Sequence, residues 1–144
     1  MFKRIVLSLA LAASVVMGLC VAAAAPDLAV TSNVLNRPGY GGSGDTMNVS
    51  ISFINSGSSV ATGGSISYTL SSELSFGTLP SGWTVVGQTA TFTGDFATGV
   101  VTNTGFSVVI NDFYSLRTVT GTVAATVAGD TDFSNNTFDA AEQL

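Results

Sequence analysis

The chain has 144 residues, of which 46% are hydrophobic and 9% charged, and its formal charge at neutral pH is −5 with no histidine. An acidic chain with four basic residues has no electrostatic attraction for a phosphate backbone, which argues against a nucleic-acid partner. The same charge argues against peripheral binding to anionic lipid.

The first 24 residues have the layout of a secretory signal peptide. Lys3 and Arg4 form a charged start, residues 5–19 are apolar, and Ala22–Ala24 provide a small-residue cleavage site. We expect this apolar leader to be helical. Its removal leaves residues 25–144, enough for one domain. The mature protein is then expected to be secreted, at the cell surface or in the periplasm.

Two other interpretations of the leader remain open. Met17–Cys20 resembles the box that directs lipid attachment to a bacterial lipoprotein, although Leu19 stands where that box has a small residue. The apolar stretch is also close to the ~20 residues that span a bilayer. It could therefore persist as an anchor, or as the core helix of a pilin-like subunit, and only then would the protein contact a membrane.

Cleavage would also remove Lys3, Arg4 and Cys20. Arg37 and Arg117 then face nine acidic residues, a formal charge of −7, and no lysine, histidine or cysteine remains. The usual catalytic bases and nucleophiles are missing, and no disulfide can form. We therefore expect no enzyme, no cofactor and no small-molecule substrate.

A pair of carboxylates could still hydrolyse a glycoside. The candidates fall mostly in predicted turns, where aspartate is favoured because it bonds to the local backbone. They are Asp95, Asp112, Asp130, Asp132 and Asp139.

Short runs of alternating apolar residues follow the leader. Residues 26–35 predict a first strand, with Leu28, Val30 and Val34 on its apolar side. A glycine-rich loop (36–44) leads to the most regular alternation, GDTMNVSISFINSG at 44–57. We take that stretch as the central strand, because a period of two separates an apolar face from a polar one.

The rest of the chain predicts further strands with turn signals between them. Leu74 and Phe76 continue the apolar pattern of 65–70, and 83–93 reads as a hairpin turning at Gly87. Seven or eight short strands without an amphipathic helix predict an all-β fold, a single antiparallel β-sandwich. The later strands are expected at 65–70, 83–86, 89–93, 106–110, 119–127 and 136–141.

Several motifs together resemble a known family. They are PDLAVT at the start of the domain, GDTMNVSISFINSGSSVATGGSISYTL, LPSGW, and DTDFSNNT before the last strand. In this order they resemble the Ig-like conserved repeat domain of bacterial and archaeal surface proteins (the domain of unknown function numbered eleven) and the related CARDB cell-adhesion module. The resemblance covers residues 27–140 and implies an Ig-like sandwich.

This sequence departs from the family pattern in three ways. It holds one copy of the domain, it shows no C-terminal anchor signal, and it has no lysine after the leader. The last point excludes the lysine–asparagine isopeptide crosslink found in some Ig-like surface modules.

Three groups of residues could form contact or modification sites. Asp130, Asp132 and Ser134 have the spacing of a calcium loop, but Asn135 replaces the sixth-position glycine and Ala141 the twelfth-position glutamate. We therefore favour an aspartate-type turn over calcium, and zinc lacks its nitrogen and sulfur ligands.

Aromatic residues supply the second group. Arg37 and Tyr40 lie in the glycine-rich loop, where a contact role is as plausible as an idle one. Trp83 and Tyr40 could stack on a sugar, although core packing is the preferred interpretation for Trp83. Asn48 and Asn135 form the third group, since both match the N-glycosylation pattern.

Three functions are consistent with these features. The leading one is a structural or adhesive module that contacts copies of itself or other surface and matrix proteins, through exchange of the first strand into an extracellular fibre. The second is a soluble binding module for a polysaccharide or a surface protein. The third is an anchored lipoprotein or pilin-like subunit.

Overall fold

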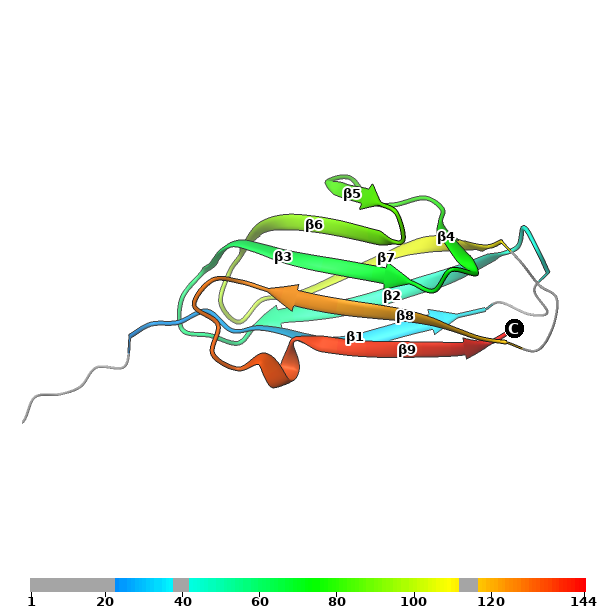
Figure 1. Ribbon diagram of the computed structural model, residues 1–144. Coiled ribbons are helices and arrows are strands. Elements are labelled where there is room, and N and C mark those ends of the chain that lie inside the picture. The colour runs from blue at the N-terminus through cyan, green and yellow to red at the C-terminus, as the bar shows by residue number, and fades with distance from the viewer. Residues whose placement is uncertain (1–22, 38–41, 112–116) are drawn as a thin grey trace, which may run out of the picture.

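The computed structural model describes residues 23–37, 42–111 and 117–144, and this part of the chain is all-β (Figure 1). Nine strands and one short 3-10 helix follow one another in it. They are β1 (Leu28–Asn36), β2 (Thr46–Asn55), β3 (Ala61–Leu70), β4 (Leu74–Phe76), β5 (Trp83–Val86), β6 (Thr89–Phe96), β7 (Val101–Ile110), β8 (Thr118–Thr126), η1 (Phe133–Asn135) and β9 (Thr137–Gln143).

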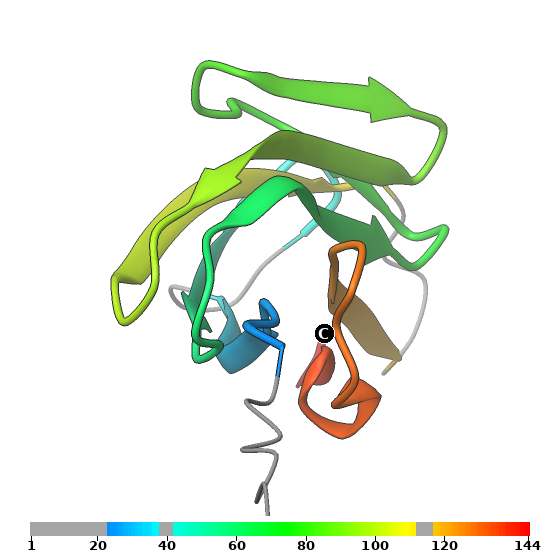
Figure 2. The same cartoon turned by 90° about the vertical axis from the view of Figure 1, so that its left-hand side faces the viewer.

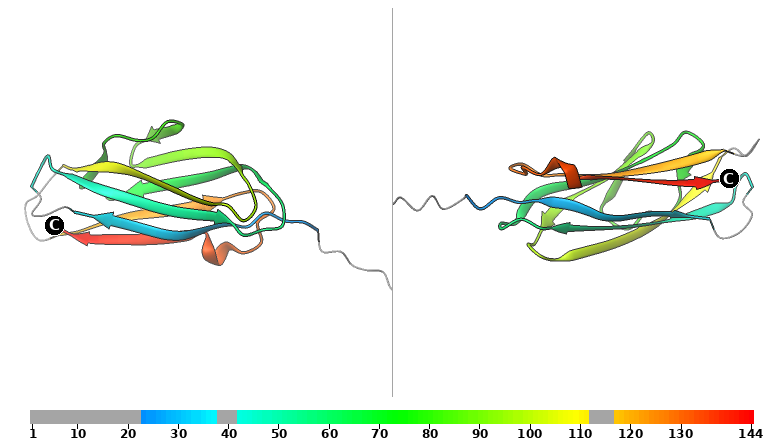
Figure 3. Two further views of the ribbon diagram at one scale, coloured as in Figure 1. Left: turned by 180° about the vertical axis from the view of Figure 1, so that it is seen from behind. Right: turned by 90° about the horizontal axis from the view of Figure 1, so that it is seen from below.

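The strands form two antiparallel sheets that pack face to face as a β-sandwich (Figure 2). One sheet has the order β1-β2-β7-β4 and the other β5-β6-β3-β8-β9. The edge strands β1 and β9 lie side by side along one open side of the sandwich, as the view from below in Figure 3 shows. The chain enters β1 at one end of the sandwich, and its last residue lies at the opposite end (Figure 1).

The strand expected to be central, β2, lies between β1 and β7. Its alternation predicts the buried face correctly: Met47, Val49, Ile51 and Phe53 are all buried between the sheets. Burying such a side chain fully stabilises the fold by about 1.5–3 kcal/mol. The prediction of an interior strand with one apolar face is confirmed.

Aromatic rings join the two sheets across the core. Tyr68 on β3 packs edge-on against Phe106 on β7, with ring centroids 5.1 Å apart and planes at 88°. Phe53 and Phe96 form a second edge-on pair at 5.4 Å. Edge-on pairs of this kind add about 0.5–1.5 kcal/mol beyond the area that they bury.

The predicted apolar side of the first strand is wrong at Val34. The pairing of β1 with β2 shifts register between Val30 and Ser32, which marks a β-bulge. An extra residue reverses the alternation beyond it, so Asn33 and Leu35 point inward and Val34 is 48% exposed.

Two strands begin earlier than the sequence predicts. Residues 74–76 form a strand of their own, whereas the apolar pattern predicts that they continue the strand at 65–70. β3 starts at Ala61 and β7 at Val101, because their first halves (ATGG and VTNTG) pair through the backbone without an apolar alternation. Leu74 and Phe76 belong to a separate strand, since the chain turns after Leu70 and pairs with β7 in the other sheet. The described residues therefore form nine strands instead of seven or eight.

The predicted helical leader falls mainly on residues 1–22, outside the described residues, and remains a prediction. The described part of the chain contains no helix long and apolar enough to cross a membrane.

Replacement of Gly121 on β8 tests the packing between the sheets. A Cβ atom at this position would overlap with the Tyr68 hydroxyl and ring on the neighbouring strand. We expect Gly121→Ala to lower the free energy of unfolding by about 1–3 kcal/mol, as overpacking does in cores. Urea unfolding followed by circular dichroism measures the loss.

The exposed neighbour Thr120 provides the control for this variant. Thr120→Ala on the same strand should change the free energy of unfolding by no more than about 0.5 kcal/mol. Equal stability of the two variants would contradict the packing described here.

Candidate functional site

A buried amide fixes β1 to the other sheet. Asn33 is 7% exposed, and its Nδ2 donates to the backbone oxygens of Gly121 (2.8 Å) and Phe138 (2.9 Å). Its Oδ1 accepts the hydroxyl hydrogen of Tyr68 at 3.2 Å. One side chain on β1 therefore connects β3, β8 and β9, and it faces inward only because of the bulge before it.

A second amide fixes the entry into β1. Asn55, at the end of β2, is completely buried. Its Oδ1 accepts from the backbone N–H groups of Asp27 and Gly57, and its Nδ2 donates to the oxygens of Ser59 and Phe96. All four hydrogen-bonding positions of the amide are used, as expected for a polar group without access to water.

The acidic residues of the predicted calcium loop also hold the start of β1. Asp130 is buried, and one of its carboxylate oxygens accepts from Leu28 N and from Asn136 Nδ2, both at 3.2 Å. The other oxygen accepts from Asp132 N at 2.9 Å. This is the aspartate-type turn that the sequence analysis favoured, and it links η1 to the first strand.

Asp132 is exposed and caps η1. The hydroxyl and the backbone N–H of Ser134 both donate to it, which lowers the pKa of the Asp132 carboxyl below its ordinary value.

The amide oxygens of Asn135 and Asn136 are buried and have no hydrogen-bond partner within the described residues. The described residues contain no group of three or more metal-binding side chains (His, Cys, Asp, Glu). Calcium binding by Asp130, Asp132 and Ser134, the alternative that the sequence disfavours, stays untested.

The other predicted site residues lie apart. Arg37 is half-buried just after β1, while Tyr40 lies outside the described residues, so their contact role stays a prediction. Asn48 is exposed on β2, as a glycosylated residue must be. The Nδ2 of Asn135 instead donates to Asp27 at 2.9 Å, and a glycan on Asn135 would have to break this bond.

The remaining carboxylates named as glycosidase candidates are engaged locally. Asp95 accepts from Gly63 N at 2.8 Å, and Asp139 accepts from the Thr122 hydroxyl at 2.6 Å. Asp112 lies outside the described residues.

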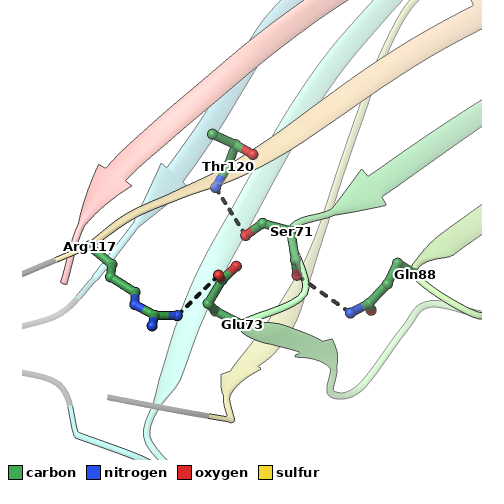
Figure 4. Close-up of polar contacts among 5 residues, drawn as sticks. All are labelled: Ser71, Glu73, Gln88, Arg117 and Thr120. Atoms are coloured by element: carbon green, nitrogen blue, oxygen red, sulfur yellow. Dashed lines mark hydrogen bonds and ion pairs between the residues drawn. The ribbon is translucent and has the colours of Figure 1, made fainter. Parts of the chain in front are cut away.

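Polar contacts also fix the opposite end of the sandwich (Figure 4). Ser71 accepts from Thr120 N through its hydroxyl and from Gln88 through its backbone oxygen. Arg117 forms an exposed ion pair with Glu73 at 3.4 Å. The backbone N–H of Glu73, nearby serine hydroxyls and the Arg117 charge lower the pKa of this glutamate. The turn between β3 and β4 is thereby held against β8.

A cavity of about 200 Å³ opens on the side of the sandwich away from β1 and β9. We call it the β5–β7 cavity. Rings of Phe53, Trp83 and Phe92 line it together with Thr102 and Thr104 of β7. Trp83 is half-buried and packs on Phe92 and Phe106 at 6.0 and 5.7 Å, so it contributes to the core and also lines this cavity.

The buried amides are not evident from the alternation of apolar residues that predicts the strands. Asn55 had a usable signal, because it continues the inward series Met47, Val49, Ile51 and Phe53. A polar residue at the end of such a series indicates a buried hydrogen-bonding group. Asn33 had no such signal, since the bulge places it inward.

Comparisons with protein-family models and with curated proteins find no match to this chain. Among solved structures, the chain is similar to a GH20 exo-β-N-acetylglucosaminidase from Vibrio harveyi, with 13% sequence identity and a TM-score of 0.34. The match covers 83% of this chain and 17% of that enzyme. The chain therefore corresponds to less than a fifth of the enzyme's length.

Removal of the Asn33 amide tests the connection between the sheets. Asn33→Ala leaves two backbone oxygens and the Tyr68 hydroxyl without their partner, and each unsatisfied buried group costs about 1–3 kcal/mol. We expect a loss of at least about 3 kcal/mol in urea unfolding. Asn36→Ala, exposed at the end of the same strand, should have little effect; a similar loss would contradict the assigned role.

Alkaline pH should destabilise the fold through Tyr68. Burial raises the pKa of Tyr68 to about 12, whereas the unfolded residue titrates near its ordinary value of 10. The unfolded state therefore loses the proton first, and stability falls as the pH rises from about 10 to 12. Thermal melting across this window should show a steeper decline for the native protein than for Tyr68→Phe. Parallel declines would contradict this assignment.

Proposed function

We propose that the chain is a non-enzymatic, Ig-like module of the cell surface or extracellular space, and that it assembles with copies of itself by exchanging β1. In such an exchange, β1 of one subunit pairs with β2 of the next subunit, in the position that the β1 of that subunit would otherwise occupy. The proposal rests mainly on one observation: β1 is an edge strand that pairs with β2 alone among the strands of its sheet.

The position that β1 occupies in the sandwich is specific for the side chains of this strand. Leu28, Val30 and Leu35 are buried against the core, and Asn33 makes its three hydrogen bonds to β3, β8 and β9. An exchanged strand would form the same contacts with a neighbouring subunit. The exchange therefore costs little in contact energy, which is the usual condition for swapping an element between protomers.

Chain length permits the exchange. Nine residues separate Asn36 from Thr46, and fully extended they would reach about 30 Å. The only covalent link from β1 to the rest of the domain runs through this segment, which the sequence analysis described as a glycine-rich loop. After cleavage of the leader, the other end of β1 would be held by non-covalent contacts alone, among them the hydrogen bonds to Asn55 and Asp130, which an exchange would break and form again in the next subunit.

Paired cysteines distinguish exchange from a closed monomer. Val34 and Ser50 are opposite each other on β1 and β2, and both are exposed. We expect Val34→Cys/Ser50→Cys, exported with its own leader and oxidised, to give a ladder of covalent multimers on non-reducing denaturing gels. In an exchanged fibre each disulfide joins two subunits, and the mature chain has no other cysteine.

Ser52→Cys/Asn103→Cys is the matched control, because it joins β2 to β7 within one subunit. This pair should give a monomer band. A monomer band from both pairs would overturn the proposal. Multimers from both pairs would also contradict it, because random collision would then explain the ladder.

A further inference from the structure

The inward face of β7 changes character along its length. Phe106, Val108 and Ile110 are buried in the core, whereas the inward positions before them are Thr102 and Thr104, both half-buried. β4 and the residues after it pair with β7 only from Ser107 onward. Within the described residues, no strand covers the Val101–Gly105 half of β7 on that side, and the β5–β7 cavity opens there.

Aromatic rings from both sheets form the apolar walls of this cavity. Trp83 and Phe92 are register partners on β5 and β6, with ring centroids 6.0 Å apart. Phe53 on β2 faces them from the other sheet and is the register partner of Thr102. Two half-buried rings at an opening leave apolar surface partly in contact with water.

The loop before β5 is held close to this opening. Gly82 has a φ of +90°, which only glycine adopts without strain, and a Cβ atom there would lie 3.0 Å from the Phe92 ring. Pro80 and Ser81 of the same loop line the cavity. The wall therefore depends on backbone geometry as well as on side-chain packing.

The polar groups that line the cavity are neutral and can form hydrogen bonds to a ligand. None of its lining residues is charged. Within the described residues, the hydroxyls of Ser81, Thr102 and Thr104 have no hydrogen-bond partner, and Asn103 uses only its Oδ1, which accepts from Ser52. Hydroxyl and amide groups beside aromatic rings can bind a ligand with an apolar C–H face and a rim of hydroxyl groups.

We propose that the β5–β7 cavity binds one neutral pyranose ring of a polysaccharide. Trp83 and Phe92 contact the C–H face of the sugar, and Thr102 and Thr104 hydrogen-bond its hydroxyl groups. The volume of about 200 Å³ lies below the ~300 Å³ at which sites for drug-sized ligands begin, which favours a single ring over several. The absence of charge in the lining disfavours uronic acids and phosphates. This proposal does not depend on the exchange of β1.

Trp83 is the only tryptophan of the chain, so tryptophan fluorescence reports on the surroundings of this one cavity-lining side chain. We would titrate the exported protein with methyl glycosides of glucose, galactose and mannose, and with the corresponding neutral polymers. Binding of at least one sugar should shift and quench the Trp83 emission with saturation. A neutral-glycan array, read through a label on the protein, provides an independent measurement.

Thr102→Val and Thr104→Val remove a hydroxyl and keep the shape of the side chain. Each should weaken sugar binding at least tenfold, with unchanged circular dichroism and unchanged Trp83 emission in the absence of sugar. Thr126→Val, exposed on β8 in the other sheet, is the matched control and should bind as the native protein does.

Two results would overturn the proposal. One is the lack of any response on the array and in the titrations with folded protein. The other is binding of an apolar peptide, or of the amphiphilic dye 8-anilinonaphthalene-1-sulfonate, that sugars do not displace and that both valine variants retain. That result would assign the cavity to an apolar occupant.

Discussion

The connection of β1 to the opposite sheet depends on the amide of Asn33, which a β-bulge turns into the interior. Without this amide, two backbone oxygens of the other sheet and the hydroxyl of Tyr68 would be buried without a partner. Asn55 and Asp130 serve the same strand at its beginning. These buried polar groups specify where β1 lies, because a shifted strand would leave them unsatisfied. The apolar contacts of β1 supply stability but are less selective about register.

The two long sides of the sandwich therefore differ in their chemistry. The edge strands β1 and β9 lie side by side (Figure 3), and buried amides and a buried carboxylate hold them in place. On the opposite side, β4 covers only half of β7, and threonines take inward positions that apolar residues occupy further along the strand. The first side suits a strand such as β1 that must bind in one register, either in its own subunit or in a neighbouring one. The second side offers neutral hydroxyl groups and aromatic rings to a ligand.

Alternation and turn signals were sufficient to predict the β-sandwich and the interior place of β2, because the apolar face of that strand is regular. The hairpin of β5 and β6 was also predictable from Gly87, which takes a positive φ. The first halves of β3 and β7 were missed, since they pair through backbone groups that side-chain patterns do not reveal. The site was predicted less well. Asp130 forms the turn that the sequence favours. Trp83 packs on Phe106 as expected, but it is only half-buried and also lines the β5–β7 cavity. The inward turn of Asn33 and the cavity beside Thr102 depend on three-dimensional packing.

The places where the chain enters and leaves the sandwich have a mechanical consequence. Residues before β1 and the last residue after β9 lie at opposite ends (Figure 1). A pulling force between them runs nearly parallel to the strands and perpendicular to the hydrogen bonds that join β1 to β2. The bonds of this ladder are then loaded together in shear and do not open one after another. Along that axis, the domain should resist extension better than it would if both ends left from the same side.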